Sequence, residues 1–132
     1  MDIYVLRAIA GELSDELAGG RVRKIVQPGR RSLLLVLDCP GQKTRNLILS
    51  ADPAYPRIHL TEKNIPSPAE PPDFCRSLRN HLIGAEVTRI SAGERERVVQ
   101  ITLEKPGAGK AGGWYALMAE IMGRWSNIVL VN

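Results

Sequence analysis

The 132-residue chain has little cysteine and no long apolar run. Its two cysteines, Cys39 and Cys75, are too few for a disulfide framework, and each lies at the edge of an apolar segment. We therefore expect two reduced core thiols. No apolar run approaches the roughly 20 residues that a membrane-spanning helix needs, and Asp2 stands where a secretory signal would carry positive charge. These absences predict a cytoplasmic protein with no membrane partner.

Acidic residues are absent between Glu16 and Asp38. Five basic residues fall within this gap: Arg21, Arg23, Lys24, Arg30 and Arg31. The chain has 18 Lys and Arg against 14 Asp and Glu, and 13 of the 18 are arginine, whose planar guanidinium pairs well with phosphate. Such a patch attracts a polyanion such as nucleic acid. Two simpler explanations stay open, namely a genome that favours arginine and a surface that is merely solvated.

Aromatic side chains are scarce, since the chain has one Phe, two Trp and three Tyr. Proteins that bind single-stranded nucleic acid without regard to sequence usually stack the bases on more aromatic rings than this. A structured RNA that is recognised by its shape and its phosphates fits the composition better. Among polyanions, we therefore expect a folded RNA.

The sequence lacks the patterns typical of metal and nucleotide cofactors. Its Cys and His residues, Cys39, His59, Cys75 and His81, do not form the close pairs of structural zinc sites. The stretch 107–110, Gly-Ala-Gly-Lys, looks like a phosphate-binding loop, but it lacks the four-residue gap and the hydroxyl residue after the lysine. We expect no metal and no cofactor, and a hairpin loop at 106–113.

Nucleophilic catalysis has little support in the sequence. Ser91 and Ser126 have no evident His and Asp partners nearby, although residues that are distant in sequence can still meet in space. His81 lies within an apolar helical pattern and fits an interfacial histidine as well as a general base. We therefore expect a binding domain and not an enzyme.

Hydrophobic periodicity predicts one α+β domain over residues 1–132, with two helices and about eight strands. The helices are expected at 2–19 and between Pro71 and Gly84. The strands are expected at 21–27, 32–39, 45–50, 57–60, 86–91, 97–105, 114–122 and 127–131. The strand at 32–39 is apolar on both faces, so we expect it at the centre of a sheet. Because the chain ends on a strand, we also expect an N-terminal fragment of a longer multidomain protein.

Four charged or polar segments are not explained by core packing: 21–28, 56–61, 94–97 and 120–127. The alternating charges at 94–97 lead into a strand and could also form solvated ion pairs. Segment 120–127 places Gly, Arg, Ser and Asn between two apolar strands, which suits an ordinary hairpin and also a contact with phosphates or base edges. On the second helix, Arg76 and Arg79 are three residues apart and can reach one ligand together.

These segments, taken in this order, resemble the N-terminal domain of the NFACT family. The resemblance spans essentially the whole chain and rests on the ordered set, since no single piece is diagnostic. The matching stretches are the opening helix with Glu12, Leu13 and Leu17, and the segments 20–28, 57–61, 71–82, 120–124 and 126–128.

The resemblance implies a fold similar to the N-terminal domain of formamidopyrimidine-DNA glycosylases, which is a β-sandwich with two helices. This agrees with the number of strands and helices that periodicity predicts. In those glycosylases a proline amine at the mature N-terminus attacks the sugar. Here Asp2 and Ile3 follow Met1, so the resemblance does not carry that chemistry over.

The resemblance also implies tRNA binding during ribosome-associated quality control. The family acts on stalled large-subunit complexes that hold a nascent chain, and it supports untemplated C-terminal tailing. Its Asp-Arg motif falls on Glu96-Arg97, where the acid is one methylene longer, and its Glu-Ile-Met motif falls on Glu120-Ile121-Met122. Trp125 stands where the family more often has histidine. The large ribosomal subunit would be reached through the full-length protein.

The residues and the resemblance together predict an RNA-binding surface. Its members are Glu96, Arg97, Glu120, Ile121, Met122, Arg124, Ser126, Asn127, Arg57, Arg79, Arg21 and Arg23. The alternative function is a protein-interaction module for fibronectin or fibrinogen, because bacterial members of the family are often labelled fibronectin/fibrinogen-binding proteins. That alternative needs export to the cell surface, for which the N-terminal sequence gives no signal.

Overall fold

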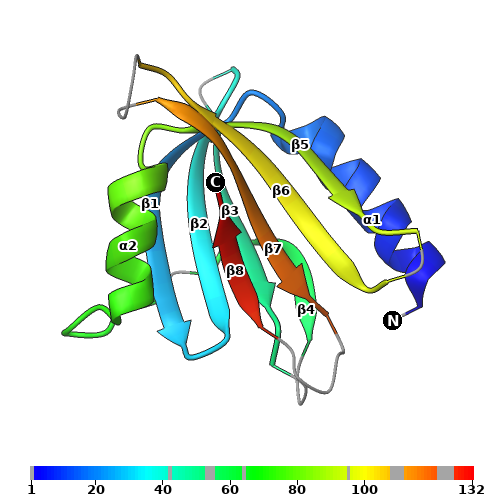
Figure 1. Ribbon diagram of the computed structural model, residues 1–132, viewed down its shortest axis with the longest axis horizontal. Coiled ribbons are helices and arrows are strands. Elements are labelled where there is room, and N and C mark those ends of the chain that lie inside the picture. Colours follow the sequence, from blue (N-terminus) through cyan, green and yellow to red (C-terminus); the bar gives the residue numbers. More distant parts are fainter. Residues whose placement is uncertain are drawn as a thin grey trace.

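Two helices and eight strands make up the computed structural model, which describes residues 2–41, 43–52, 56–63, 65–94, 96–107, 112–121 and 127–132. In chain order they are α1 (Ile3–Leu17), β1 (Arg21–Gly29), β2 (Ser32–Cys39), β3 (Lys43–Ser50), β4 (Arg57–Thr61), α2 (Asp73–Leu82), β5 (Glu86–Ala92), β6 (Val98–Lys105), β7 (Gly113–Glu120) and β8 (Ile128–Val131). The predicted α+β class is confirmed, and each predicted helix and strand is present at its place in the chain (Figure 1).

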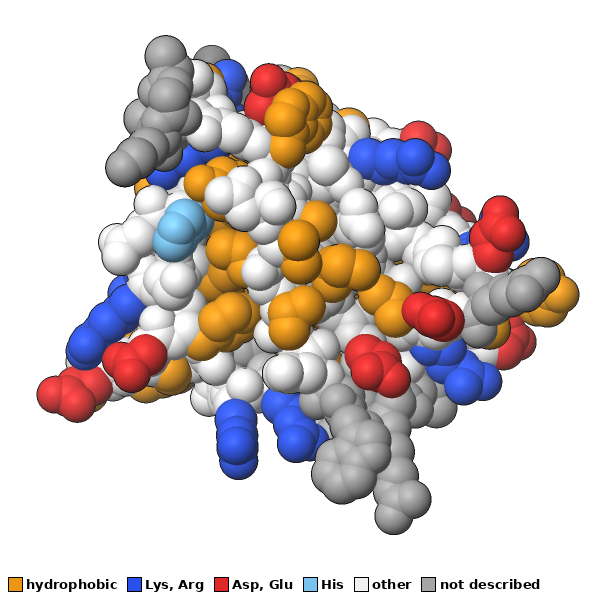
Figure 2. Space-filling model, viewed as in Figure 1, with side chains coloured by type: hydrophobic (Ala, Val, Ile, Leu, Met, Phe, Trp, Pro, Cys, Tyr) orange, Lys and Arg blue, Asp and Glu red, His pale blue; other side chains and the backbone are white. Residues whose placement is uncertain are grey.

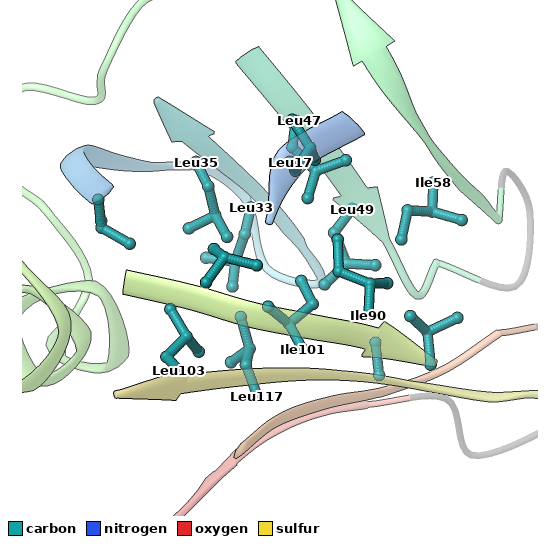
Figure 3. Close-up of a cluster of buried hydrophobic side chains, with 14 of the residues drawn as sticks. Leu17, Leu33, Leu35, Leu47, Leu49, Ile58, Ile90, Ile101, Leu103 and Leu117 are labelled. Atoms are coloured by element: carbon teal, nitrogen blue, oxygen red, sulfur yellow. The ribbon is translucent and has the colours of Figure 1, made fainter. Parts of the chain in front are cut away.

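The eight strands form one antiparallel sheet in the order β4-β3-β2-β1-β5-β6-β7-β8. The joint between β1 and β5 is narrow, because these two strands share the single residue pair Arg21↔Glu86. The sheet folds over at this joint into two four-stranded halves, β4 to β1 and β5 to β8. Side chains of the two halves point toward one another in a shared core (Figure 3). The result is the predicted β-sandwich, built from a continuous sheet.

Strand β2 lies inside its half of the sheet and buries both of its faces. Leu33, Leu35 and Leu37 alternate into the main core. In Figure 3, Leu33 and Leu35 face Ile101 and Leu117 of the other half. The intervening side chains form a smaller cluster on the opposite face, which consists of Leu34, Val36, Val26 and Ile48 with Ile65 packed against them. This double burial explains the continuous apolar run and confirms the predicted central position of the strand.

Helix α1 packs on β5, in the second half of the sheet. Its N-cap residue, Asp2, accepts a 2.8 Å hydrogen bond from the backbone N–H of Val5 through Oδ1. The hydroxyl oxygen of Ser14 accepts a 2.9 Å hydrogen bond from the N–H of Ile90 on β5. The buried stripe of the helix is Leu6, Ala10, Leu13 and Leu17. Gly19 follows with a φ of 87°, a conformation that favours glycine.

Helix α2 packs on β1, on the side of the molecule away from α1 (Figure 1). Its buried residues are Cys75, Leu78 and Leu82. Cys75 and Cys39 are both free thiols and both buried, as the sequence predicted. In the part of the chain that the structure describes, no helix is long and apolar enough to cross a membrane.

Candidate nucleic-acid interface

Two segments that are far apart in the sequence meet at one end of β6 and β7. Val98, the first residue of β6, pairs with Glu120, the last residue of β7. Just beyond this pair, the backbone N–H of Ile121 donates a 2.7 Å hydrogen bond to the carbonyl of Arg97. The N–H of Glu120 in turn donates a 3.0 Å hydrogen bond to the carbonyl of Asn127. The fold therefore brings together the two predicted motifs, Glu96-Arg97 and Glu120-Ile121.

The charged members of these motifs are exposed, whereas the apolar member is not. Glu96, Arg97 and Glu120 all have exposed side chains, and we call these three residues the strand-end rim. Ile121 is fully buried at 0% exposure, and its backbone N–H makes the hydrogen bond to Arg97. Asn127 is exposed, and its Oδ1 accepts a 2.9 Å hydrogen bond from the N–H of Ile128. Met122, Arg124 and Ser126 lie outside the described residues.

The strand-end rim carries two carboxylates beside one guanidinium. A guanidinium can grip a phosphate or the O6 and N7 acceptors of guanine, and a carboxylate can accept from an exocyclic amino group of a base. Carboxylates repel the phosphate backbone, so a surface of this composition does not act by bulk positive charge. The arrangement of Glu96, Arg97 and Glu120 is chemically suited to contact base edges and backbone together.

Arg21 and Arg23 lie away from the strand-end rim. Glu86 pairs with Glu104 at the opposite end of β6 from Val98, and Arg21 lies beside Glu86 in the sheet. Nη2 of Arg21 is 3.8 Å from Oε1 of Glu86, and Nη1 of Arg23 is 3.6 Å from Oδ1 of Asp38. Both pairs are exposed and contribute little to stability. The most basic stretch of the sequence is thus partly neutralised and does not join the rim.

The guanidinium of Arg79 turns inward from α2 to β1. Its Nε and Nη2 donate hydrogen bonds of 3.0 Å and 2.8 Å to the carbonyl of Ile25, and the thiol of Cys75 lies 3.7 Å from the same oxygen. Arg76, which the sequence placed beside Arg79 for a shared ligand, instead lies 3.9 Å from the carboxylate of Asp73. The structure therefore gives Arg79 a fold-stabilising contact that helical spacing alone did not indicate.

Arg57 is half-buried at the start of β4, where it pairs with Ser50. It lines a hollow of about 420 Å³ together with His59, Lys63 and the hydroxyl residue Thr61. This hollow contains three groups that can carry positive charge, and it is separate from the residues of the strand-end rim. Among the predicted site residues that the structure describes, the rim members, Ile121 and Asn127 are brought together by backbone contacts.

His81 and the two cysteines do not form a metal-holding group in the described residues. Nδ1 of His81 lies 2.7 Å from the carbonyl oxygen of Ser77, one turn earlier on α2, and its ring meets the ring of Tyr115 edge-on at 5.8 Å. Within the described ranges, no group of three His, Cys, Asp or Glu side chains could hold a metal ion.

Sequence reasoning missed a second hollow, of about 790 Å³, between α2, the end of β1 and β8. It is lined by Gln27, Phe74 and Tyr115 among others. Gln27 is only 5% exposed, which is unusual for a polar side chain. The one signal in the sequence was a glutamine in an otherwise apolar end of a strand, directly before Pro28.

A β-sandwich of eight antiparallel strands with two helices, carrying exposed charged side chains where β6 begins and β7 ends, defines the class of this domain as α+β. The family model described as NFACT N-terminal and middle domains matches residues 2–132. The chain belongs to the NFACT family.

Curated relatives are longer than this chain. It is 38% identical over 131 residues to the Rqc2 homolog RqcH of Streptococcus pneumoniae serotype 2, a match that covers 99% of this chain and 24% of the relative. It is 35% identical over 121 residues to the Rqc2 homolog RqcH of Bacillus subtilis, which covers 92% of this chain and 21% of the relative. The chain thus spans about a quarter of the length of these relatives.

Solved structures share the fold closely. The N-terminal domain of fibronectin-binding protein PavA from Streptococcus pneumoniae superposes with a TM-score of 0.91 at 37% identity, covering 99% of this chain and 49% of that one. The N-terminal part of the fibronectin/fibrinogen-binding protein from Streptococcus suis gives a TM-score of 0.89 at 30% identity, covering 100% of this chain and 49% of that one. The expected family and fold class are both confirmed.

Proposed function

We propose that this chain is the tRNA-binding N-terminal domain of a cytoplasmic ribosome-associated quality-control factor. The full-length factor would act on stalled large-subunit complexes that hold a nascent chain and would support C-terminal tailing of that chain. Membership of the NFACT family and the names of the curated relatives support this process. Within it, we assign the strand-end rim to tRNA and expect this domain to bind without catalysing a reaction.

The observation that carries the proposal is the meeting of Arg97 with Glu120 at one sheet end. The register Val98↔Glu120 and the hydrogen bond from Ile121 to Arg97 fix the two chain segments against each other. Ordered strands hold contact groups more rigidly than free loops do, so less conformational entropy is lost when a ligand binds. The backbone segments that carry the exposed acid and base are thus held together before any RNA arrives.

The mixed charge of the strand-end rim favours a structured RNA over a polyanion that is bound by charge alone. The net charge of +4 supplies a weak general attraction for phosphates. Glu96 and Glu120 oppose that attraction locally, so the close approach of RNA to the rim is unfavourable unless each carboxylate accepts a hydrogen bond from it. Base amino groups offer such donors. We therefore expect tRNA to present unpaired bases to the rim.

A salt-titrated filter-binding assay with purified tRNA tests the role of Arg97. The matched control is Arg7→Ala, which removes the same charge from an exposed position on α1. We expect Arg97→Ala to weaken binding by roughly tenfold, as for the loss of one good base contact. If Arg97 contacts a phosphate instead, the slope of the logarithm of the binding constant against the logarithm of the salt concentration should fall in magnitude by about 0.7 to 0.9. Equal affinities for Arg97→Ala and Arg7→Ala at every salt concentration would contradict the proposal.

The same assay on Glu120→Gln separates recognition from bulk electrostatics. If charge alone governs binding, removing this carboxylate should strengthen the affinity for tRNA, because one repulsive charge is lost. If Glu120 accepts from a base, the substitution should weaken it, since an amide oxygen is the poorer acceptor. We expect the second outcome. Glu12→Gln, an exposed acid on α1, serves as the control for the charge change.

A second candidate function is binding of fibronectin or fibrinogen. It is favoured by the names of the two solved neighbours, a fibronectin-binding protein and a fibronectin/fibrinogen-binding protein. A pull-down with immobilised fibronectin at physiological salt distinguishes the two functions. Retention of the wild-type chain that survives both tRNA competition and Arg97→Ala would favour the protein-interaction module.

A further inference from the structure

A basic hollow lies against strand β4, and we call it the β4 hollow. Its volume is about 420 Å³, and its lining comes from the β1–β2 hairpin, from β3 and β4, and from the segment that follows β4. The lining residues that matter here are Ser32, Ile48, Arg57, His59, Thr61 and Lys63. No Asp or Glu of the described chain lines the hollow, so its charge is positive.

The alternation of side chains along β4 turns its polar residues to one face of the sheet. Ile58 is buried in the main core between the two halves of the sheet. Successive side chains of a strand point to opposite faces, so Arg57, His59 and Thr61 share the other face. His59 pairs with Ile48 of β3, which belongs to the smaller apolar cluster on that face. The hollow therefore combines polar side chains from β4 with an apolar contribution from β3.

Local hydrogen bonds orient two of the polar groups. The hydroxyl oxygen of Thr61 accepts a 3.1 Å hydrogen bond from the backbone N–H of Lys63, and this tight turn brings Lys63 to the hollow. The hydroxyl can still donate its own hydrogen. Nδ1 of His59 lies 2.9 Å from the carbonyl oxygen of Leu60, and a carbonyl only accepts, so Nδ1 carries the proton. Nε2 of His59 is therefore the atom that gains a proton and can donate it to an anion.

The set of donors in the β4 hollow fits a phosphate group better than a carboxylate. Arg57, Lys63 and a protonated His59 supply charged donors, and Ser32 and Thr61 add two hydroxyls. A carboxylate offers two acceptor oxygens, and a phosphate group offers more. Arg, Lys, Ser and Thr side chains are among the groups that contact phosphate oxygens in protein–nucleic acid complexes. Positive groups gathered in one hollow also repel one another, and a bound anion relieves that repulsion.

The basic surface continues around the hairpin between β1 and β2. A neighbouring hollow of about 340 Å³ shares Gly29 and Ser32 with the β4 hollow and is lined by Arg30 and Arg31, with Asp52 as its acid. In Figure 2, basic side chains project at the lower margin of the molecule, the end at which Figure 1 shows this hairpin. A basic surface that extends in this way suits a backbone with successive phosphates, as in RNA.

We propose that the β4 hollow is a phosphate-binding site that holds a phosphodiester of bound RNA. Arg57 and Lys63 neutralise the phosphate, protonated His59 donates from Nε2, and the hydroxyl of Thr61 adds a further hydrogen bond. The strand-end rim contacts bases, and the hollow supplies the positive charge that a rim with two carboxylates and one guanidinium lacks. The identity of the ligand as RNA rests on the proposed function, whereas the site for a phosphate group does not.

The chain has two histidines, and NMR of their rings tests the phosphate site directly. At about pH 6, where an ordinary imidazole is largely protonated, dimethyl phosphate should shift the ring signals of His59. The variant His59→Gln assigns these signals, and the signals of His81, which lies on α2 outside the hollow, are the internal control. Acetate at the same ionic strength should shift His59 much less. No shift of His59, an equal response to both anions, or equal shifts of both histidines would overturn the phosphate site.

Filter binding of tRNA tests whether RNA supplies the phosphate. Lys63→Gln should weaken binding by roughly fivefold to tenfold at low salt, because one phosphate contact is lost. The slope of the logarithm of the binding constant against the logarithm of the salt concentration should fall in magnitude by about 0.7 to 0.9. The matched control is Lys43→Gln, which removes the same charge from an exposed position at the start of β3, outside the hollow, and should leave the slope unchanged.

The two assays separate this inference from the proposed function. If tRNA binding responds to Arg97→Ala while Lys63→Gln behaves as Lys43→Gln does, RNA does not use the hollow, so the inference is overturned and the proposed function stands. If tRNA does not bind while dimethyl phosphate still shifts His59, the proposed function fails and RNA is overturned as the ligand. The hollow is then a site for a free phosphate ester. Shifts of His59 by both tRNA and dimethyl phosphate, together with the loss in Lys63→Gln, would support the inference.

Discussion

The backbone N–H of Ile121 donates a 2.7 Å hydrogen bond to the carbonyl of Arg97. This bond joins the residue that follows β7 to the residue that precedes β6. It positions the exposed Glu120 next to the exposed Arg97 without using either side chain. The buried isoleucine side chain holds this segment in place.

Because Ile121 is buried and Glu120 is exposed, substitutions at these two neighbouring positions should differ in their effect on stability. Ile121→Ala should lower the free energy of unfolding by about 2–5 kcal/mol, because a fully buried isoleucine is truncated in the core. Glu120→Ala should change stability by less than about 0.5 kcal/mol, because its side chain is exposed. Urea denaturation of the two variants measures the difference. Comparable losses of stability would contradict the assignment of Ile121 to packing and Glu120 to the surface.

The helices and strands were predictable because their signals are local. The stripe of α1, the double-faced apolar run at 33–37 and the turns at Pro40-Gly41 and Gly84 each depend on residues close in sequence. The boundaries moved by a few residues: β3 begins at Lys43 instead of residue 45, and β1 continues to Gly29. Sheet pairing lengthens both strands beyond the apolar segments that sequence patterns detect.

The site was less predictable because its contacts join remote parts of the chain. Nothing local to Arg97 indicates that its carbonyl accepts from Ile121, and nothing local to Arg79 indicates that it turns toward Ile25. The edge position of β8 likewise follows from the order of the whole sheet. The family resemblance located the two motifs, but their meeting is a property of the fold.

Arg79 is predicted to stabilise the fold. Arg79→Ala removes two hydrogen bonds to the carbonyl of Ile25 and should lower the free energy of unfolding by roughly 1–3 kcal/mol. Arg76→Ala is the control, because its exposed pair with Asp73 should contribute less than about 1 kcal/mol. Chemical denaturation gives both values. A stable Arg79→Ala variant with strongly reduced tRNA affinity would instead assign this side chain to RNA.

Asp2 is predicted to serve as a helix cap and not as part of a glycosylase centre. Its Oδ1 accepts from Val5 N–H, so Asp2→Ala should cost about 0.5–2 kcal/mol of stability, and Asp2→Asn should recover most of it. Borohydride trapping on a damaged DNA duplex should give no covalent adduct with the wild-type chain. A trapped adduct would show that a different amine attacks the sugar, and it would contradict the expectation that this domain catalyses no reaction.

Because of Cys39, the stability of this domain is expected to depend on pH in the alkaline range. Burial raises the pKa of the Cys39 thiol above its usual value, with Asp38 and Glu16 adding to the rise and Arg45 opposing it. The folded state therefore keeps its thiol proton more tightly than the unfolded state does. The resulting stabilisation is fully present below the unfolded-state pKa and is lost as pH rises through the raised folded-state pKa.

The stability difference between the wild-type chain and Cys39→Ala should accordingly shrink as the pH rises above about 8.5, the ordinary pKa of a cysteine thiol. Denaturation of both proteins between pH 7 and pH 10 measures it. Alkylation of Cys39, followed by mass spectrometry of its peptide, should also be slower than that of a free thiol at each pH, because thiolate is the reacting form. A pH-independent difference together with fast alkylation would mean that water reaches this thiol in solution.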